Sequence, residues 1–325
     1  MYRTAKTVHA FDSDWLMRRN CRNYLVEVKL NTFRDTVRRK DFVVTAELPL
    51  GADQTMQDLL DHLAVLGPVV DAVQVGCGEG VDVEIAALAA ASIAHESGVD
   101  AIVHLSSRDR NRIALQNDIL GAAALGATAL IPRRGEKLPS SLRGRVKGVF
   151  DTKAVQLLTA ARRVGENSEF VEGGLFLGCL VSAFRPKQDW NAKLVKEKLD
   201  AGAGFIQTRP SVEFDIVRGY VSRLVSLRLT HRAAVIVGVP LLTSATAART
   251  IGDRHPGATI PDEVIEQLAN AADPRAEGVQ LLAGLLANLA SVPGVSGVAI
   301  LDVEDCRAVA EAVEISGVLD QPGSG

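Results

Sequence analysis

The chain has 325 residues, of which 47% are hydrophobic and 4% aromatic, and its formal net charge is −3. A chain of this length can bury a large core, and a charge so close to neutral gives no general attraction to nucleic acid or to a membrane surface. No apolar run approaches the roughly 20 residues that a membrane-spanning helix needs. We therefore expect a globular protein with neither a nucleic-acid partner nor a membrane partner.

The first residues and the cysteines indicate a cytoplasmic protein. The sequence MYRTAKTVHAFDSDW lacks the apolar stretch of a signal peptide. The four cysteines, Cys21, Cys77, Cys179 and Cys306, lie far apart and form no CxxC pair. This spacing is typical of reduced thiols and argues against a zinc site, so we expect a cytoplasmic localisation and no metal.

Residues 1–40 differ in composition from the rest of the chain, because they hold ten Lys or Arg and only four Asp or Glu. We expect an N-terminal basic arm that includes a short helix packed over one end of the domain. An arm that binds a phosphate group or a partner protein is the alternative.

From Asp41 onwards, apolar runs of strand length alternate with segments of helical periodicity. The eight runs are residues 42–48, 72–76, 101–104, 127–131, 175–180, 204–208, 233–239 and 297–301. The helical segments lie near 55–66, 82–97, 110–125, 151–164, 190–202, 211–229, 243–292 in several pieces, and 304–315. Continuous apolar strands that are each followed by a helix are typical of a parallel sheet covered by helices. We therefore predict a (β/α)8 TIM barrel over residues 41–316, with a doubly wound sheet as the alternative, and a flexible tail at 317–325.

The central strand–helix–strand unit, residues 101–136, has the clearest signals. The run Ala101–Val103 stops on His104, and Ser107 or Asp109 is expected to cap the helix that follows. The helix-spaced apolar residues Ile113, Leu120 and Leu125 are expected to face the core, and Gly126 is expected to close the helix.

In a barrel the functional residues lie just past the carboxyl ends of the strands, so the polar residues there are candidates. The first run contains Glu47 in an otherwise apolar sequence. A buried carboxyl group there has a raised pKa and suits a general acid, although a glutamate paired with a neighbouring arginine is the alternative.

The next strand ends contain a glycine-rich turn, a histidine and a charged loop. The turn Gly76-Cys77-Gly78-Glu79-Gly80 is similar to a dinucleotide-binding motif, but Val81 stands where that motif has its third glycine. His104 ends the third run; a lone histidine is more often structural than catalytic. The fourth run leads into Arg133, Arg134 and Glu136, and a carboxylate beside arginines stays ionised.

Several of these segments resemble the 5,10-methylenetetrahydrofolate reductase family over about residues 35–310. Thr45-Ala46-Glu47-Leu48-Pro49 is similar to the family's Phe-Glu-Phe-Pro-Pro-type motif, and His104-Leu105-Ser106 to its His-Leu-Thr strand end. Arg134-Gly135-Glu136 resembles the family's Arg-Gly-Asp loop. Residues 198–209, KLDAGAGFIQTR, resemble the stretch Lys-x-Asp-Ala-Gly-Ala-x-x-x-Ile-Thr-Gln, and Val235–Pro240 and Val292–Val295 also match.

The resemblance implies a barrel enzyme that reduces 5,10-methylenetetrahydrofolate with a nicotinamide donor, NADH or NADPH, in one-carbon metabolism and methionine biosynthesis. It implies Glu47 as the catalytic acid. A second set of residues is implied in binding the tetrahydrofolate substrate, namely Gln74, Glu136, Gln207 and Arg209. A third set is implied in binding the cofactor, namely Gly76, His104, Arg134 and Arg185. The family also implies a homo-oligomer.

Typical members of the family pass the hydride through FAD, but the positions that contact the flavin differ here. Gln74 and Val75 stand where the family has threonine and tyrosine, Glu136 replaces an aspartate, and Arg185 replaces a histidine. These differences favour direct hydride transfer without bound flavin. An FAD-dependent reductase is one alternative, and a folate-binding or methyl-transfer protein on the same barrel is another.

Overall fold

The computed structural model describes residues 32–78, 83–138, 142, 144–255, 258 and 260–319, with only the backbone described at 252–254. Residues 1–31 of the expected basic arm and residues 320–325 of the expected tail lie outside this part of the chain. So do Glu79, Gly80 and Val81 of the glycine-rich turn.

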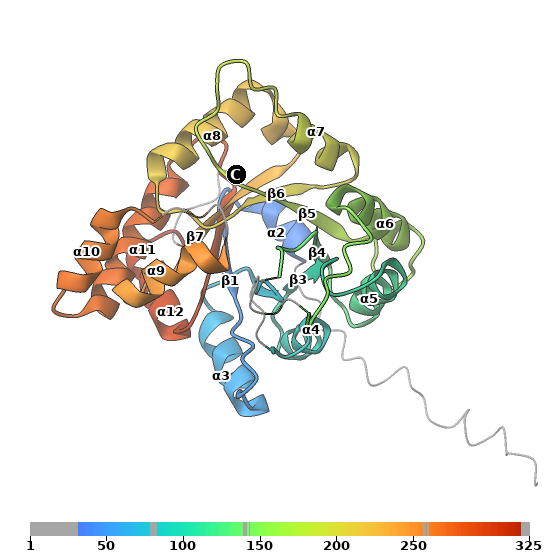
Figure 1. Cartoon of the computed structure of the whole chain (residues 1–325), viewed down its shortest axis with the longest axis horizontal. Coiled ribbons are helices and arrows are strands. Elements are labelled where there is room, and N and C mark those ends of the chain that lie inside the picture. Colours follow the sequence, from blue (N-terminus) through green and yellow to red (C-terminus); the bar gives the residue numbers. More distant parts are fainter. Residues whose placement is uncertain are drawn as a thin grey trace, which may run out of the picture. The chain divides into compact units, whose positions relative to one another are not determined.

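Within the described residues, eight parallel strands form a closed barrel in the order of the sequence (Figure 1). The strands are β1 (Val43–Glu47), β2 (Ala72–Val75), β3 (Ala101–Ser106), β4 (Ala129–Arg133), β5 (Phe176–Val181), β6 (Phe205–Thr208), β7 (Ala234–Pro240) and β8 (Gly297–Leu301). Closure is made by β8, which pairs with β1 so that Val298 lies opposite Val44. The predicted TIM barrel is therefore confirmed, and the doubly wound alternative is excluded because such a sheet stays open.

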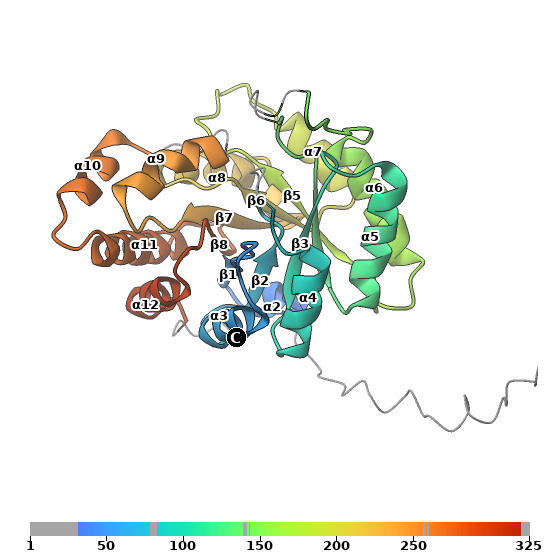
Figure 2. The ribbon, with the colours of Figure 1, turned by 60° about the horizontal axis from the view of Figure 1, so that its bottom comes forward.

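Helices surround the strands in both ribbon views (Figures 1 and 2). They are α3 (Met56–Leu66), α4 (Ala87–Glu96), α5 (Arg112–Ala124), α6 (Ala154–Glu166), α7 (Lys193–Asp200), α8 (Phe214–Ser226), α11 (Pro274–Ala290) and α12 (Cys306–Ser316). A short 3-10 helix, η3 (Leu229–His231), precedes β7. Two additional helices, α9 (Ala245–Arg254) and α10 (Asp262–Asn270), lie between β7 and α11. They account for the several helical pieces expected over residues 243–292.

Helix α5 begins and packs differently from the sequence prediction. Its N-cap is Asn111, whose side chain accepts a hydrogen bond from the Ala114 N–H at 2.9 Å, and not Ser107 or Asp109. The buried residues of the helix are Leu115, Ile119, Ala122 and Ala123, whereas Ile113, Leu120 and Leu125 are exposed by 70%, 45% and 40%. The prediction of this face was wrong because it counted only large apolar side chains. The buried face instead includes Ala122 and Ala123, which lie at helical spacing from Leu115 and Ile119.

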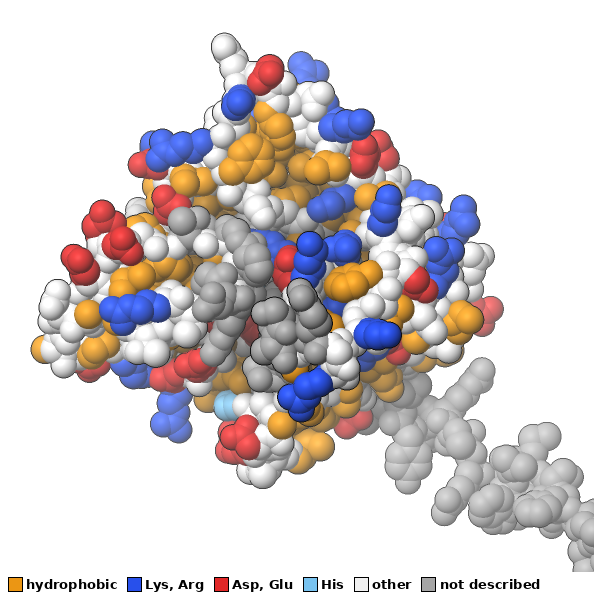
Figure 3. Space-filling model, in the orientation of Figure 1, with side chains coloured by type: hydrophobic (Ala, Val, Ile, Leu, Met, Phe, Trp, Pro, Cys, Tyr) orange, Lys and Arg blue, Asp and Glu red, His pale blue; other side chains and the backbone are white. Residues whose placement is uncertain are grey.

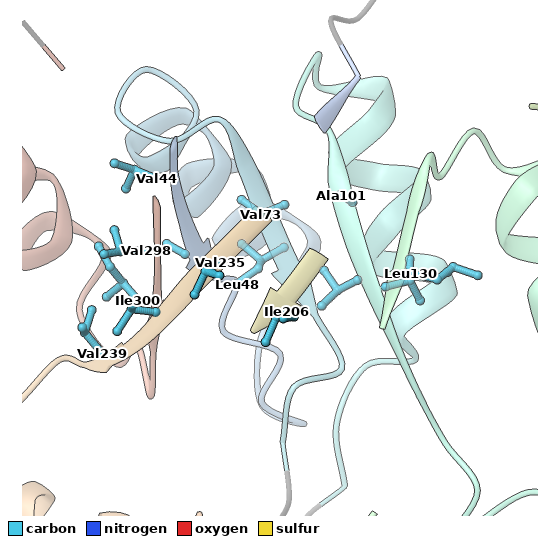
Figure 4. Close-up of a cluster of buried hydrophobic side chains, with 14 of the residues drawn as sticks. Val44, Leu48, Val73, Ala101, Leu130, Ile206, Val235, Val239, Val298 and Ile300 are labelled. Carbon is cyan, nitrogen blue, oxygen red and sulfur yellow. The ribbon is translucent and has the colours of Figure 1, made fainter. Parts of the chain in front are cut away.

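Alternate residues along each strand point outward to the helices or inward to the barrel, as in any β-strand. The outward residues form the main aliphatic core with the helices, and Figure 4 shows part of it, including Val44, Val73 and Ile206. The inward apolar residues form a second cluster, which includes Val43, Ile102 and Phe205 near the amino-terminal ends of their strands.

The second cluster is completed by the short helix α2 (Phe33–Arg39). Phe33 is fully buried there, with its ring centroid 5.5 Å from that of Phe205 and 6.0 Å from that of Phe176. The Phe33 N–H donates to Asp100 Oδ2 at 2.6 Å, which ties the start of α2 to β3. Because one end of the barrel interior is filled in this way, the polar inward residues at the other end form the site.

Candidate active site

Glu47 is the last residue of β1 and lies partly exposed at the carboxyl end of the barrel. Burial, helped by the nearby Asp302 carboxylate, raises the pKa of its carboxyl group to about 7. A hydrogen bond from the Asp302 backbone and the imidazole of His255 act in the opposite direction. A carboxyl group with this pKa is partly protonated at neutral pH, which is the property of a general acid.

Two residues from other parts of the chain form a chain of contacts with Glu47: Asp302 contacts Glu47, and His255 contacts Asp302. The N–H of Asp302, directly after β8, donates to Glu47 Oε2 at 2.7 Å. His255, the C-cap residue of α9, has its Nε2 2.8 Å from Asp302 Oδ2. Neither residue was among those predicted from the sequence.

A cavity of about 870 Å³ adjoins this group. Its lining is rich in carboxyl groups, and His255 is the single basic side chain among the described residues that line it. The carboxyl groups belong to Glu47, Asp53, Glu84, Asp302 and Glu304.

A buried hydrogen-bond network lies inside the barrel beside the cavity. Gln74 donates through Nε2 to Thr45 Oγ1 at 2.8 Å and to Gln207 Oε1 at 3.0 Å. Its Oε1 lies 2.9 Å from His104 Nε2 and accepts from Gln207 Nε2 at 3.0 Å. Thr45, Gln74 and Gln207 have no exposed surface. The two predicted glutamines therefore contact each other and His104.

His104 is neutral in this environment. Burial, together with the charges of Arg133 and His255, holds the pKa of its imidazole well below the usual range. With Gln74 Oε1 as acceptor, Nε2 is the donor and carries the ring proton. His104 thus lies below the mouth of the barrel, where it lines a small central cavity together with Gln207 and Arg209.

The turn after β2 is closed by Arg133, the last residue of β4. Its guanidinium group donates to the carbonyl oxygens of Gly76, Cys77 and Gly78 at 2.8, 2.8 and 2.7 Å. Gly76 has a φ of +72°, and a Cβ there would lie 2.8 Å from the Cβ of Ala87, so a side chain has no room. The carbonyl oxygen of Gly76, a predicted cofactor residue, therefore already accepts a hydrogen bond from Arg133.

Glu136 and Arg209, both predicted to bind substrate, form an ion pair between the loops after β4 and β6. Arg209 Nη2 donates to Glu136 Oε1 at 2.5 Å. Both residues line a cavity of about 180 Å³, together with Arg133, Arg134 and Lys198. Gly135 before Glu136 has a φ of +80°, and a Cβ there would lie 2.2 Å from Ser106 Oγ, which explains the glycine of this loop.

The two remaining predicted residues, Arg134 and Arg185, are both exposed. Arg134 is exposed and has its guanidinium carbon 4.6 Å from the centroid of the Phe150 ring. Arg185 is exposed in the loop after β5 and is not among the residues that line the cavities described above. Figure 3 shows Lys and Arg side chains gathered over α5, α6 and α7 on this face.

The structure thus brings Glu136 together with Arg209, and Gln74 together with Gln207 and His104. The central cavity shares Arg133 and Arg209 with the cavity at Glu136, and it shares His255 with the cavity at Glu47. Asp302 could have been found from the sequence, because it directly follows the eighth apolar run. His255 lies in a helical segment far from Asp302 in sequence, and no local pattern indicates it.

Among the described residues, neither a metal-binding cluster nor a membrane-spanning helix is found. No group of three or more His, Cys, Asp and Glu side chains is arranged to hold a metal ion. None of the helices is both long and apolar enough to cross a bilayer.

The fold and the site define a (β/α)8-barrel protein whose polar site, with a raised-pKa carboxyl group, lies at the carboxyl ends of the strands. The model of the methylenetetrahydrofolate reductase family matches residues 32–317, which is most of the chain. The chain belongs to this family. Membership supports the reduction of a folate one-carbon group as its general class of activity.

The other comparisons are less informative. None of the curated proteins matches the chain. Among solved structures, dihydropteroate synthase (FolP) from Thermus thermophilus is 17% identical, with 86% of this chain and 95% of that chain covered and a TM-score of 0.46. The spore cortex-lytic enzyme SleL from Bacillus cereus is 10% identical, with 85% and 75% covered and a TM-score of 0.49. Likeness at this level says nothing about the reaction.

Proposed function

We propose that the protein reduces 5,10-methylenetetrahydrofolate to 5-methyltetrahydrofolate with a hydride taken directly from NADH or NADPH. The observation that carries this proposal is Glu47, an acid with a pKa of about 7 at the end of β1 in a member of this family. It lies at the wall of a cavity large enough to admit a substrate.

The chemistry needs an acid before it needs a hydride. The methylene carbon is bonded to both N5 and N10, and the bond to N10 must break before the carbon can accept a hydride. Protonation of N10 by Glu47 makes N10 a leaving group and produces an iminium ion at N5. The hydride then adds to the methylene carbon, the nicotinamide is oxidised, and Glu47 is left as a carboxylate that takes up one proton from the solvent.

The pair Glu136–Arg209 is the proposed anchor of the pterin ring. An ionised carboxylate can accept two N–H donors from the pterin amide and amine, and Glu136 already accepts a charged donor in this position. Binding of the pterin would replace or share the contact with Arg209. Such anchoring orients the methylene carbon toward the hydride donor, an effect that can be worth several kcal/mol.

For Gln74 and Gln207 we propose a supporting role. Both amide groups are buried and bonded to each other, and the oxygen of Gln74 also contacts His104. These hydrogen bonds favour a rigid arrangement of the three side chains inside the barrel. In this arrangement the neutral ring of His104 lines the central cavity. Of these three residues, Gln207 and His104 line that cavity and Gln74 does not, so Gln74 would act through the other two.

The proposed absence of bound flavin is supported by how the second and fifth loops are used. Val75 is fully buried, and the Arg133 guanidinium group donates hydrogen bonds to three carbonyl oxygens of the turn after β2. Arg185 is exposed and is not among the residues that line the three cavities described above. These residues do not form a cradle for an isoalloxazine ring. We propose that the nicotinamide itself stacks near the pterin.

The charges around the mouth support one orientation of the ligands. Carboxyl groups line the cavity at Glu47, whereas Arg133, Arg134, Lys198 and Arg209 line the cavity at Glu136. The phosphates of the dinucleotide are attracted to the basic side. Arg134 and, farther out, Arg185 are the proposed phosphate contacts.

The test is an assay of the purified protein with NADH and 5,10-methylenetetrahydrofolate, combined with a visible absorption spectrum. We expect NADH oxidation that depends on the folate, 5-methyltetrahydrofolate as product, and no flavin absorption. Folate binding without NADH or NADPH oxidation would contradict the reductase and indicate a folate-binding protein instead. Activity in a protein with stoichiometric flavin would contradict only the direct transfer.

A further inference from the structure

The residue that contacts Glu47 has an unusual backbone conformation. Asp302 has a φ of +54°, in the left-handed region that residues other than glycine seldom adopt. Aspartate and asparagine tolerate this region better than most residues, but the conformation still has an energetic cost. It turns the chain directly after β8, and the Asp302 N–H donates to Glu47 Oε2 at 2.7 Å.

The side chain of Asp302 is held from a second direction. Its Oδ2 lies 2.8 Å from His255 Nε2, and both side chains are only 8% exposed. The contact joins the turn after β8 to the end of α9. A strained residue persists where its surroundings hold it, and such residues cluster at functional sites.

We propose that Asp302 and His255 are positioning residues for Glu47: His255 holds the Asp302 turn, and the backbone N–H of that turn holds Glu47 Oε2. The proposal rests on the proposed function only for the identity of the atom that Glu47 protonates. Because Oε2 accepts a hydrogen bond from the backbone, the acidic proton resides on Oε1 and is presented to the ligand. When the proton leaves Oε1 for the substrate nitrogen, the new carboxylate keeps the N–H donor, and a hydrogen bond to a charged acceptor is stronger.

The two residues also act on the acidity of Glu47 in opposite directions. The Asp302 carboxylate raises the pKa of Glu47, whereas the His255 imidazole lowers it. Glu84, on the segment before α4, is the other charged group that acts on Glu47, and it raises the pKa. The thiol of Cys77 also lies close enough for Glu47 to raise its pKa, but burial keeps this thiol protonated. Loss of the Asp302 carboxylate should therefore lower the pKa of Glu47, whereas loss of the His255 imidazole should raise it.

The first part of the test is an infrared titration of Glu47 in the ligand-free protein. The carboxyl band that disappears in Glu47→Gln identifies the group. We expect its midpoint near pH 7 in the wild type, lower in Asp302→Asn and higher in His255→Gln. Asp53→Asn is the matched control, because Asp53 lines the same cavity but is not among the groups that shift Glu47. Equal midpoints in the wild type, Asp302→Asn, His255→Gln and Asp53→Asn would overturn the proposal. This result does not depend on the reaction.

The second part separates the backbone from the charge and uses turnover. Asp302→Gly and Asp302→Ala both lack the carboxylate, but only glycine adopts the left-handed conformation without cost. We expect a kcat about tenfold lower in Asp302→Ala than in Asp302→Gly, with the same KM for the folate. Equal kcat values would overturn the positioning role. If the wild type does not reduce the folate, the proposed function fails, while the infrared titration still decides the role of Asp302 and His255.

Discussion

Glu47 combines two properties that oppose each other, because it must be buried enough to hold a proton and open enough to deliver it. Burial is the largest cause of its raised pKa, and the cavity beside it supplies the opening. A glutamate in water at pH 7 is almost fully ionised and is a poor acid. The location at the end of β1 therefore creates the raised pKa on which the proposed acid role depends, and changes to this one residue give the most specific tests.

Replacing Glu47 with Gln should remove the acid without disturbing the fold. Glutamine has the same shape, and its oxygen can still accept the hydrogen bond from Asp302. We expect kcat to fall by about 10²–10⁴-fold, which is the usual contribution of general acid catalysis, while the dissociation constant for the folate changes little. Steady-state kinetics and calorimetric titration measure the two quantities. A variant with near wild-type kcat would exclude Glu47 as the acid.

The same substitution should change how stability depends on pH. The pKa of Glu47 is about 7 in the folded protein, against an ordinary value of 4.5, so the unfolded chain releases this proton first as the pH rises. The stability that comes from neutral Glu47 is fully present below about pH 4.5 and is lost as the pH rises through 7, by roughly 3 kcal/mol in total. Glu47→Gln has no such loss, so its stability relative to the wild type should be higher at pH 8 than at pH 5. Urea unfolding at both pH values measures this, and an equal difference at the two values would contradict the raised pKa.

Replacing Glu136 with Ala should weaken folate binding more than dinucleotide binding. The substitution leaves pterin N–H donors without their charged acceptor, and it also leaves Arg209 without the partner that it contacts at 2.5 Å. We expect a rise in the KM for the folate of about tenfold or more, with a smaller change for NADH. Glu304→Gln, in the other cavity, is a control for a change of charge at the mouth. An effect confined to the KM for NADH would assign this loop to the dinucleotide.

At the scale of elements, helix α2 closes one end of the barrel and Asp302 shapes the other. Phe33 fills the interior below the polar network, and its aromatic contacts reach β5 and β6. The barrel is therefore packed from below by a helix that precedes its first strand. The family match also begins at residue 32, immediately before this helix.

Replacing Phe33 with Ala should destabilise the whole barrel. A fully buried phenylalanine that is replaced by alanine leaves a cavity and typically costs about 3–5 kcal/mol. Arg38→Ala, at an exposed position of the same helix, should change stability by less than about 0.5 kcal/mol. Chemical unfolding of the two variants tests this. A Phe33 variant as stable as the Arg38 variant would mean that α2 is not part of the folding unit.

The strands were predictable because each is a continuous apolar run, and all eight appear within one or two residues of the expected bounds. The face of α5 was not, because Ala122 and Ala123 pack as closely as larger residues and periodicity weighted by size overlooks them. The position of Glu47 could also be predicted, and Asp302 follows a predicted strand end, but the contacts among Glu47, Asp302 and His255 could not be predicted. The contact of Asp302 with Glu47 spans 255 residues and depends on closure of the barrel, and His255 reaches the site through tertiary packing alone.

At the scale of the whole molecule, an acidic cavity at Glu47 and a basic cavity at Glu136 each share lining residues with the small central cavity. The proposed function requires two ligands to bind here at the same time. They are a folate held by Glu136 and a dinucleotide whose phosphates face the basic side. Simultaneous binding is what direct hydride transfer requires. It predicts sequential kinetics, whereas a flavin that carries the hydride between two half-reactions gives parallel double-reciprocal lines.

The central claim, direct reduction of the folate by NADH, is tested most directly by following the hydride itself. NADH that carries deuterium at the transferred position is mixed with excess purified enzyme and a limiting amount of 5,10-methylenetetrahydrofolate in ordinary water, with no flavin added. We predict that 5-methyltetrahydrofolate forms with one deuterium in each new methyl group, and that this content stays the same when addition of the folate is delayed. A reduced flavin exchanges its transferable hydrogen with water, so loss of deuterium during the delay would contradict direct transfer, and failure to form the methyl product would contradict the reductase.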